Sequence, residues 1–308
     1  MSDGPTLVAE AGGSSTLPLV PPPSEIDLPE DWHTFGGATY HLSRRVGEGG
    51  MGVVYEARSP AVSEPVALKL IRGTPDDIAL ARFAREAELP QRFNGHPHVV
   101  RVLDVGRFDN GHRYIAFEYL GGGSLAAHAA EFRAPAAAAA LLTQVATAVG
   151  DLHEKGVRHR DLKPDNLLFR TLPPDPAGVV VTDFGQAWGG QQVNRPTGDG
   201  QPLGTPTYAA PELLRDAAAA DQRADIYSLG AILFRLLTGV VPTEVTWPNS
   251  LTDDYKTARA AEPPPPSRRF PPDVPAHLVS ACRGCLHPHP DGRFPTAREF
   301  LRALTQHS

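Results

Sequence analysis

Short runs of apolar and β-branched residues recur along the chain between Tyr40 and Leu120. Runs of this kind, separated by Gly, Asn and Asp, are typical of strands. They read HLSRRV, GVVYEAR, VALKLI, VVRVLDVG and YIAFEYL. One segment among them, Asp76 to Phe93, interleaves apolar and charged residues at helical spacing and predicts a helix. The pattern therefore predicts an antiparallel sheet accompanied by one main helix.

After the GGGS segment at 121–124 the chain becomes rich in Ala and Leu, and its apolar spacing becomes helical. Helices are predicted near residues 134–154, 209–219, 222–239, 275–286 and 296–305. Strands followed by helices indicate an α+β protein with two lobes. We assign residues 38–119 to an N-terminal lobe and residues 120–308 to a mostly helical C-terminal lobe. Pro-rich stretches at 173–176 and 263–266 are predicted to be surface loops.

Residues 1–37 differ in composition and pattern, because they mix Gly, Ser and Pro without helical or strand periodicity. We predict a disordered tail there. The tail holds six acidic residues and no Lys or Arg, which accounts for the whole formal charge of −6. The rest of the chain is electrically balanced, so it has no basic field for nucleic acid or an anionic membrane surface. We expect no nucleic-acid partner.

Cellular context is suggested by three further features of the sequence. No apolar run approaches the length of a membrane span, and the first residues, MSDGPTLVAE, lack the basic region of a secretory signal. Two cysteines cannot form a disulfide framework, which fits a reducing compartment. We expect a cytoplasmic protein without a membrane span.

Three glycines, Gly47, Gly49 and Gly52, lie between two strand-like runs. Glycines bring backbone N–H groups close to phosphate oxygens because no Cβ intervenes. A similar spacing marks dinucleotide-binding folds, but there it opens a helix, and the continuation VVYEAR is strand-like. The segment is either a phosphate-binding hairpin or an ordinary glycine-rich turn.

Lys69 lies among apolar strand residues in a chain with only four lysines. A buried ammonium needs a partner because its desolvation is costly. Glu86, in the predicted helix, is the suitable carboxylate, and Glu88 is the alternative. If Lys69 instead lies at an edge of the sheet, its ammonium can reach water without a partner.

Five motifs follow one another in a fixed order: GEGGMGV, VALK, HRDLKPDN (159–166), DFG (183–185) and APE (210–212). In this order they resemble the signature set of eukaryotic-type protein kinases. The wording of GGMGVVYEAR, HRDLKPDN and GTPTYAAPE is most similar to the bacterial (Hanks-type) Ser/Thr kinases of that family. The resemblance covers roughly residues 40–305. It implies a two-lobed kinase fold that transfers the γ-phosphate of ATP to Ser or Thr hydroxyls of proteins.

The resemblance assigns catalytic roles to four residues. Lys69, held by Glu86, would grip the α- and β-phosphates of ATP. Asp161 would accept the proton of the substrate hydroxyl, and Lys163 would reach the γ-phosphate as its charge develops. Taken singly, Asp161 could equally be a turn carboxylate.

The same resemblance implies a metal site and an adenine pocket. Asn166 and Asp183 would supply oxygen ligands to Mg²⁺, although each could also be a cap. Phe117 falls at the gatekeeper position, and the backbone of Glu118 and Leu120 would hydrogen-bond adenine. The apolar residues expected around the ring are Val54, Ala67 and Leu168, which could also be plain core residues.

Regulation by phosphorylation is also implied by the resemblance. Arg160 would pair with a phosphorylated residue of the activation loop. Thr197 is the only hydroxyl-bearing residue between Asp183 and Gly204, so it is the candidate, and self-association would allow autophosphorylation. Thr205 is expected to line the substrate groove beside the catalytic Asp.

Two pairings are expected farther along the chain. Glu212 and Arg293 resemble the buried ion pair that stabilises the second lobe of the family, and Asp225 resembles the residue that anchors the catalytic loop. Cys282 and Cys285, with His287 and His289 nearby, allow either a zinc site or buried thiols.

One residue departs from the pattern. Pro90 follows Glu86 by four residues, where proline removes a helical hydrogen bond. Either the helix is short, or it is mobile and needs a partner to place Glu86. A partner-binding pseudokinase and a kinase of small molecules are the rival functions; the intact motifs disfavour the first, and GTPTYAAPE disfavours the second.

Overall fold

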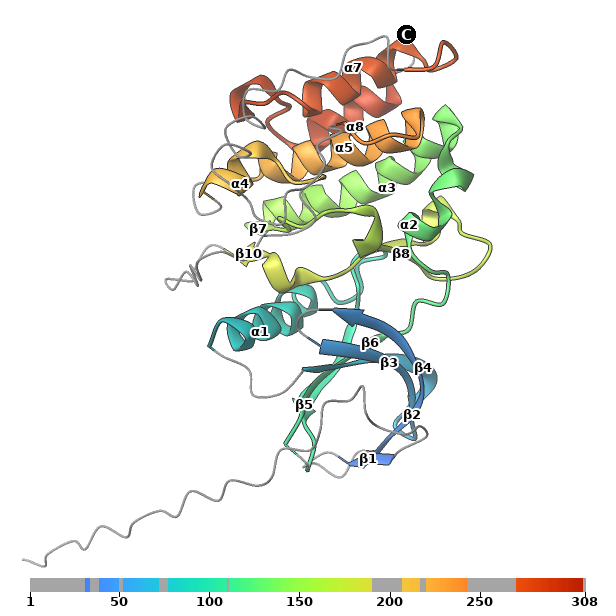
Figure 1. Cartoon of the computed structure of the whole chain (residues 1–308), viewed down its shortest axis with the longest axis vertical. Coiled ribbons are helices and arrows are strands. Elements are labelled where there is room, and N and C mark those ends of the chain that lie inside the picture. Colours follow the sequence, from blue (N-terminus) through green and yellow to red (C-terminus); the bar gives the residue numbers. More distant parts are fainter. Residues whose placement is uncertain are drawn as a thin grey trace, which may run out of the picture.

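The computed structural model describes residues 31–33, 39–49, 52–71, 77–109, 111–189, 207–216, 220–242 and 270–306. A sheet with one helix forms one lobe, and a mostly helical lobe packs against it (Figure 1). This arrangement confirms the predicted α+β fold with two lobes.

The N-terminal lobe is built on a six-stranded sheet of order β1-β2-β3-β4-β6-β5. Its strands are β1 (Asp31–His33), β2 (Thr39–Gly49), β3 (Gly52–Ser59), β4 (Val62–Ile71), β5 (Val102–Arg107) and β6 (Arg113–Glu118). Every neighbouring pair is antiparallel, as predicted. Strand β1 corrects one expectation, because part of the predicted disordered tail pairs with β2. The outer edge of β2 offers the unpaired backbone groups that such a strand uses.

The two faces of β4 pack against different cores, because side chains alternate along a strand. Leu68 and Leu70 join the apolar cluster on one face, together with Tyr55 of β3. Ile71 joins Phe83 of helix α1 (Asp77–Gln91) on the other face. Lys69 shares the face of Ile71, so the strand period directs it toward α1.

Helix α1 continues through Pro90 and ends one residue later, at Gln91. Proline lacks the N–H that would bond the carbonyl of residue 86. The chain leaves the helix in a tight turn, in which the Phe93 N–H donates to the Pro90 carbonyl at 2.8 Å. Pro90 therefore marks the end of the helix without breaking the turn that carries Glu86.

The C-terminal lobe is mostly helical (Figure 1). Its helices are α2 (Leu125–His128), α3 (Pro135–Glu154), α4 (Pro211–Asp216), α5 (Arg223–Thr238), α7 (Ala276–Cys285) and α8 (Ala297–Thr305). Two small antiparallel ladders complete it: β7 (Val157–Arg158) with β10 (Trp188–Gly189), and β8 (Leu167–Phe169) with β9 (Val179–Val181). All the longer predicted helices form, within a few residues of their predicted bounds.

Helix α3 is the one helix among the described residues that is long and apolar enough to span a membrane. Its apolar side chains have another explanation, because Leu141, Leu142 and Val145 are fully buried in the core of the lobe. The helix packs against α5 and α8. Its composition is thus that of a core helix.

Candidate active site

Strands β2 and β3 form the predicted glycine hairpin, and the last residue pair in their register is Gly49 and Gly52. Gly52 has a structural requirement that the sequence did not reveal. A Cβ at this position would lie 2.1 Å from the carbonyl oxygen of Leu70, on the neighbouring strand β4. Gly47 has more room, since its Cβ would lie 3.8 Å from Val54. Gly52 is needed for close packing of strands, whereas Gly47 lines the cavity beneath the hairpin.

Lys69 of β4 and Glu86 of α1 form the predicted ion pair. The Lys69 Nζ lies 2.5 and 2.6 Å from the two carboxylate oxygens of Glu86. The Glu86 side chain is only 5% exposed, while Glu88 faces solvent. Burial alone would lower the pKa of Lys69, but the charges of Glu86 and Asp183 hold that pKa above its ordinary value. The ammonium therefore stays charged at the centre of the site.

Three of the predicted residues lie close together in residues 159–166, the catalytic loop. Lys163 Nζ donates to Asp161 Oδ2 at 2.9 Å, and Asn166 Nδ2 donates to the same oxygen at 3.1 Å. Asn166 Nδ2 also donates to the Asp161 carbonyl at 2.8 Å. The Asn166 amide nitrogen is thus occupied, which leaves its Oδ1 as the atom that can serve a cation. Burial raises the pKa of Asp161, and Lys163 offsets part of that effect.

Asp225 of α5 holds the backbone of this loop in place. Its carboxylate accepts the N–H groups of His159 at 2.9 Å and Arg160 at 2.7 Å. It also accepts His153 Nε2 from α3 at 2.8 Å. Burial opposes ionisation, but these hydrogen bonds hold the pKa of Asp225 below its ordinary value. The predicted anchor is present, and His153 is a partner that sequence reasoning missed.

Asp183 reaches the same site from the other side. It adopts a positive φ of 61° and caps the turn Phe184–Gln186 by accepting the Gly185 N–H. Burial alone would raise its pKa, but Lys69, His159, the Gly185 N–H and Lys163 together hold the pKa of Asp183 below its ordinary value. Helix α1 packs on this turn. Lys69 contacts Glu86 and acts on Asp183 through its charge, so it links the helix electrostatically to Asp183.

A cavity of about 520 Å³ lies between the lobes and opens beside these charges. Among its lining residues are those predicted for the adenine site: Val54, Ala67, Phe117, Glu118, Leu120 and Leu168. Gly47, Lys69, Glu86 and Asp183 also line it. The cavity joins an apolar part to the cluster of charged groups, which suits a ligand with a flat apolar ring and an anionic end.

Several residues in the cavity wall, and one that contacts a wall residue, were not identified from the sequence. Arg44 and Val46 enter from β2, and Tyr119 follows directly after β6. Arg170, just beyond β8, is ion-paired with the Glu118 carboxylate and donates to the Pro97 carbonyl at 3.0 Å. No local motif marks these residues, because their contacts join segments far apart in the chain.

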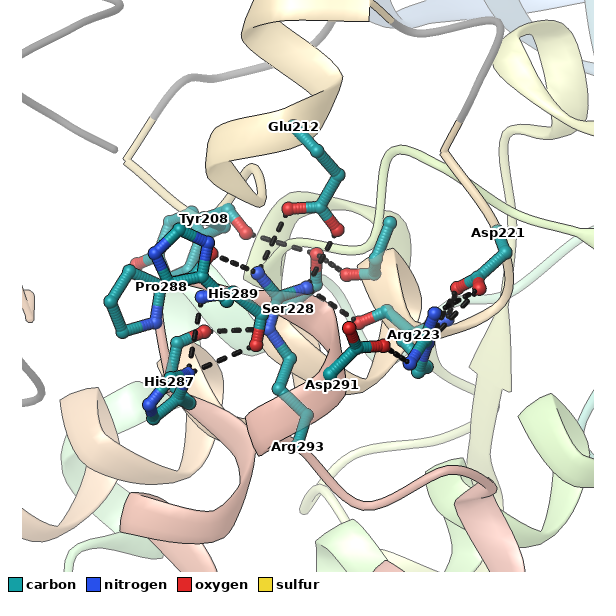
Figure 2. Close-up of polar contacts among 11 residues, drawn as sticks. Tyr208, Glu212, Asp221, Arg223, Ser228, His287, Pro288, His289, Asp291 and Arg293 are labelled. Atoms are coloured by element: carbon teal, nitrogen blue, oxygen red, sulfur yellow. Dashed lines mark hydrogen bonds and ion pairs between the residues drawn. The ribbon is translucent and has the colours of Figure 1, made fainter. Parts of the chain in front are cut away.

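Figure 2 shows the polar cluster around Arg293. Arg293 Nη1 and Nη2 donate to the two oxygens of Glu212 at 2.6 and 2.8 Å. Its remaining donors reach the carbonyl groups of His287, Pro288 and Arg223. The predicted Glu212–Arg293 pair forms, and all the guanidinium nitrogens are used.

The zinc alternative for Cys282 and Cys285 is wrong. Both thiols are free and buried, and burial raises their pKa values. His287 is instead occupied by the backbone of His289. Throughout the described part of the chain, no group of three or more potential ligands is placed to hold a metal ion in this manner.

The remaining predicted residues concern regulation. Arg160 is buried, and its Nη2 donates to the Ala220 carbonyl at 3.1 Å. Arg158 Nη1 donates to the same carbonyl at 3.2 Å, so two guanidinium groups meet there. Thr197 and Thr205 lie outside the described residues.

Known proteins are similar to this chain in both sequence and fold. Residues 40–304 match the protein kinase domain. Serine/threonine-protein kinase pkn3 of Myxococcus xanthus is 38% identical over 245 residues, 75% of this chain and 43% of that protein. PknJ of Mycobacterium tuberculosis is 35% identical over 271 residues, 86% of this chain and 45% of that protein. The crystal structure of the M. tuberculosis PknI kinase domain matches with a TM-score of 0.62 and 30% identity, covering 86% of this chain and 94% of that one.

The chain therefore belongs to the protein kinase family. Its sequence relatives above are bacterial Ser/Thr kinases, as the motifs indicated. The chain spans less than half the length of these two relatives.

Proposed function

We propose that this protein is an ATP- and Mg²⁺-dependent Ser/Thr protein kinase. The observation that carries the proposal is the grouping of four residues. Lys69 and Asp183 line one cavity, and Asn166, which is hydrogen-bonded to Asp161, accepts the N–H of Thr182, the neighbour of Asp183, at 2.9 Å. Phosphoryl transfer needs positioning and charge neutralisation more than covalent participation by the protein. This site supplies both, because hydrogen bonds hold an ammonium, two carboxylates and an amide side chain in place.

The residues fit both cofactors. The apolar wall would hold adenine, with the backbone of Glu118 and Leu120 as hydrogen-bonding groups. Lys69 would bind the α- and β-phosphates, and Asn166 Oδ1 and the Asp183 carboxylate would hold Mg²⁺, which prefers such oxygen ligands. When bound, the metal ion neutralises charge on the phosphates.

Asp161 is suited to the protein substrate. Its carboxylate would orient the Ser or Thr hydroxyl and accept its proton. Lys163, already bonded to Asp161, would donate to the transferred phosphoryl group. The Lys69–Glu86 ion pair supports activity over a pseudokinase role, since it places Glu86 beside the lysine that would bind the phosphates.

The test is incorporation of labelled γ-phosphate from ATP and Mg²⁺, comparing wild type with Asp161→Asn. We expect label on Ser or Thr of added protein or of the chain itself, and its loss in the variant. Mass spectrometry identifies the acceptor residues. Label that persists in Asp161→Asn, or no label in wild type despite nucleotide binding, would contradict the proposal.

We further propose that autophosphorylation of Thr197, through self-association of two chains, raises activity. The convergence of Arg158 and Arg160 on one carbonyl supports this, because two guanidinium groups concentrate positive charge for a phosphate. Thr197→Ala should lower activity after preincubation with ATP, and Thr197→Ser should retain the increase. Full activity of Thr197→Ala from the first turnover would contradict this step.

The proposed location is the cytoplasm, where ATP and reduced thiols are available. The two buried free cysteines are compatible with that compartment. Partition of the native protein between soluble and membrane fractions of a bacterial host tests this location.

A further inference from the structure

Three polar side chains meet beside the cavity, and two of them, Arg44 and Tyr119, line it. Arg44 Nε donates to Glu56 Oε2 at 2.9 Å, and Arg44 Nη2 donates to the hydroxyl oxygen of Tyr119 at 2.7 Å. Arg44 lies on β2 and Glu56 on β3, the two strands that carry the glycine hairpin. Tyr119 lies in the connection between the lobes, directly after β6.

The sheet itself brings two of these side chains together. Arg44 and Glu56 are directly opposite each other in the β2–β3 register, and such cross-strand pairs share one face of a sheet. The contact with Tyr119 is of another kind, because β3 and β4 separate β2 from β6 in the sheet. Arg44 thus ties the hairpin directly to the connection between the lobes, in addition to the backbone ladder.

The surroundings of Tyr119 keep its hydroxyl group, which contacts Arg44, in the neutral form. Burial raises the pKa of Tyr119, and the nearby Glu56 carboxylate raises it further, so the phenol keeps its proton. Arg44 and Tyr119 both line the cavity, together with Val46 and Gly47 of the hairpin. The Arg44–Tyr119 contact therefore belongs to the cavity wall, on the side where Arg44 is exposed to solvent.

We propose that Arg44, Glu56 and Tyr119 form a latch that holds the glycine hairpin over bound adenine nucleotide and slows nucleotide release. The inference rests on the nucleotide binding in the proposed function. Arg44 is a positioning residue here, since it acts through the hairpin. Its side chain is 63% exposed, and exposed ion pairs contribute little. We therefore expect an effect of about two- to five-fold on release.

The experiment measures dissociation of N-methylanthraniloyl-ADP from the full chain with Mg²⁺, using stopped-flow fluorescence and an excess of unlabelled ADP. Arg44→Ala and Tyr119→Phe should each release the nucleotide faster, and Arg44→Lys should restore part of the difference. The double variant should match Arg44→Ala, because both changes remove the same contact. Higher salt should reduce the difference, since the Arg44–Glu56 pair is screened.

Arg45→Ala is the matched control. Arg45 is the next residue of β2 and pairs with Glu48 at 2.7 Å, but it does not line the cavity. This variant removes one positive charge from the same strand, and we expect the wild-type release rate. Steady-state kinetics add a second readout: Arg44→Ala should raise KM for ATP without lowering kcat, which a general loss of folding would not do.

The outcomes separate the latch from the proposed function. Equal release rates for wild type and Arg44→Ala, or an equal increase in Arg45→Ala, overturn the latch while nucleotide binding stands. Wild-type protein that fails to bind the labelled ADP overturns both. Faster release in Arg44→Ala and Tyr119→Phe, but not in Arg45→Ala, supports the latch. This holds whether or not a protein substrate is phosphorylated.

Discussion

Burial of Asp161 brings two requirements of the site into conflict. A proton acceptor must be ionised, yet burial raises the pKa of this carboxyl and Lys163 offsets only part of that effect. A group whose pKa is higher in the folded state favours folding when protonated. Its contribution is fully present below the ordinary pKa of Asp and is lost as pH rises through the raised value. At neutral pH, the ionised Asp161 therefore lowers the free energy of unfolding.

Asp161→Asn should consequently lower kcat and raise stability together. Loss of a general base costs about 10²–10⁴-fold in rate. The melting temperature at pH 7 should exceed that of wild type, and the difference should shrink as pH falls below the ordinary Asp pKa. Differential scanning calorimetry across pH measures this. The control is Asp165→Asn, an exposed position of the same loop, whose melting temperature should not change; a lower melting temperature for Asp161→Asn would contradict the argument.

The sequence could identify the residues that chemistry requires, and less easily those that only position them. Lys69 was recognised as a buried lysine in need of a carboxylate, and the helix phase then decides between Glu86 and Glu88. Arg44 and Arg170 carried no such signal, because an arginine on a strand or just beyond one is ordinary. Their importance depends on Tyr119 and Glu118, which only the fold brings near.

At the scale of elements, the longer helices and strands were predictable because each repeats its period several times. The ladders β7–β10 and β8–β9 have two or three residues per strand, too few to show a period. Strand β1 was missed for a related reason. Its three residues form a strand only because β2 presents an open edge, which is a tertiary circumstance.

The glycine hairpin gives a prediction at the same scale. Gly52→Ala would place a Cβ 2.1 Å from the Leu70 carbonyl oxygen, so β3 must move away from β4. Overpacking of this kind costs about 1–3 kcal/mol of unfolding free energy, measured by urea denaturation. Gly47→Ala meets only ordinary contacts, the nearest at 3.8 Å, and should unfold like wild type. Equal losses in the two variants would show that hairpin flexibility matters more than the strand contact.

At the scale of the molecule, the core of the C-terminal lobe extends into the segment that follows α1. Leu89 of α1 and Val99 and Val100, which follow it, belong to the same buried cluster as the helices of the C-terminal lobe. The Val100 N–H donates to the Val181 carbonyl at 3.0 Å, and the Val181 N–H donates to the His98 carbonyl at 2.9 Å. The predicted boundary between the lobes, at residue 119, divides the chain only by its position along the sequence. In space, the segment after α1 also belongs to the second lobe, which the sequence pattern could not indicate.

The cluster around Arg293 supports the last prediction, which concerns the stability of the C-terminal lobe (Figure 2). Arg293→Ala removes both hydrogen bonds to Glu212 and three to backbone carbonyls. Breaking one partner of a buried pair costs about 3–5 kcal/mol, so the urea midpoint should fall strongly. Glu212→Gln, which keeps the shape and one acceptor, should fall less.

The control for that loss is Arg223→Ala in the same cluster. Arg223 pairs with Asp221 and Asp291 at 2.8 and 2.6 Å, but the Asp291 side chain is 93% exposed. Exposed pairs contribute about 0–1 kcal/mol, and the Arg223 carbonyl still accepts Arg293 Nη1 in this variant. A urea midpoint that falls equally in both variants would mean that charge, and not burial, determines the stability of this lobe. We expect only Arg293→Ala to change it strongly, because Arg223 and its partner Asp291 are open to water whereas the Arg293 side chain is fully buried.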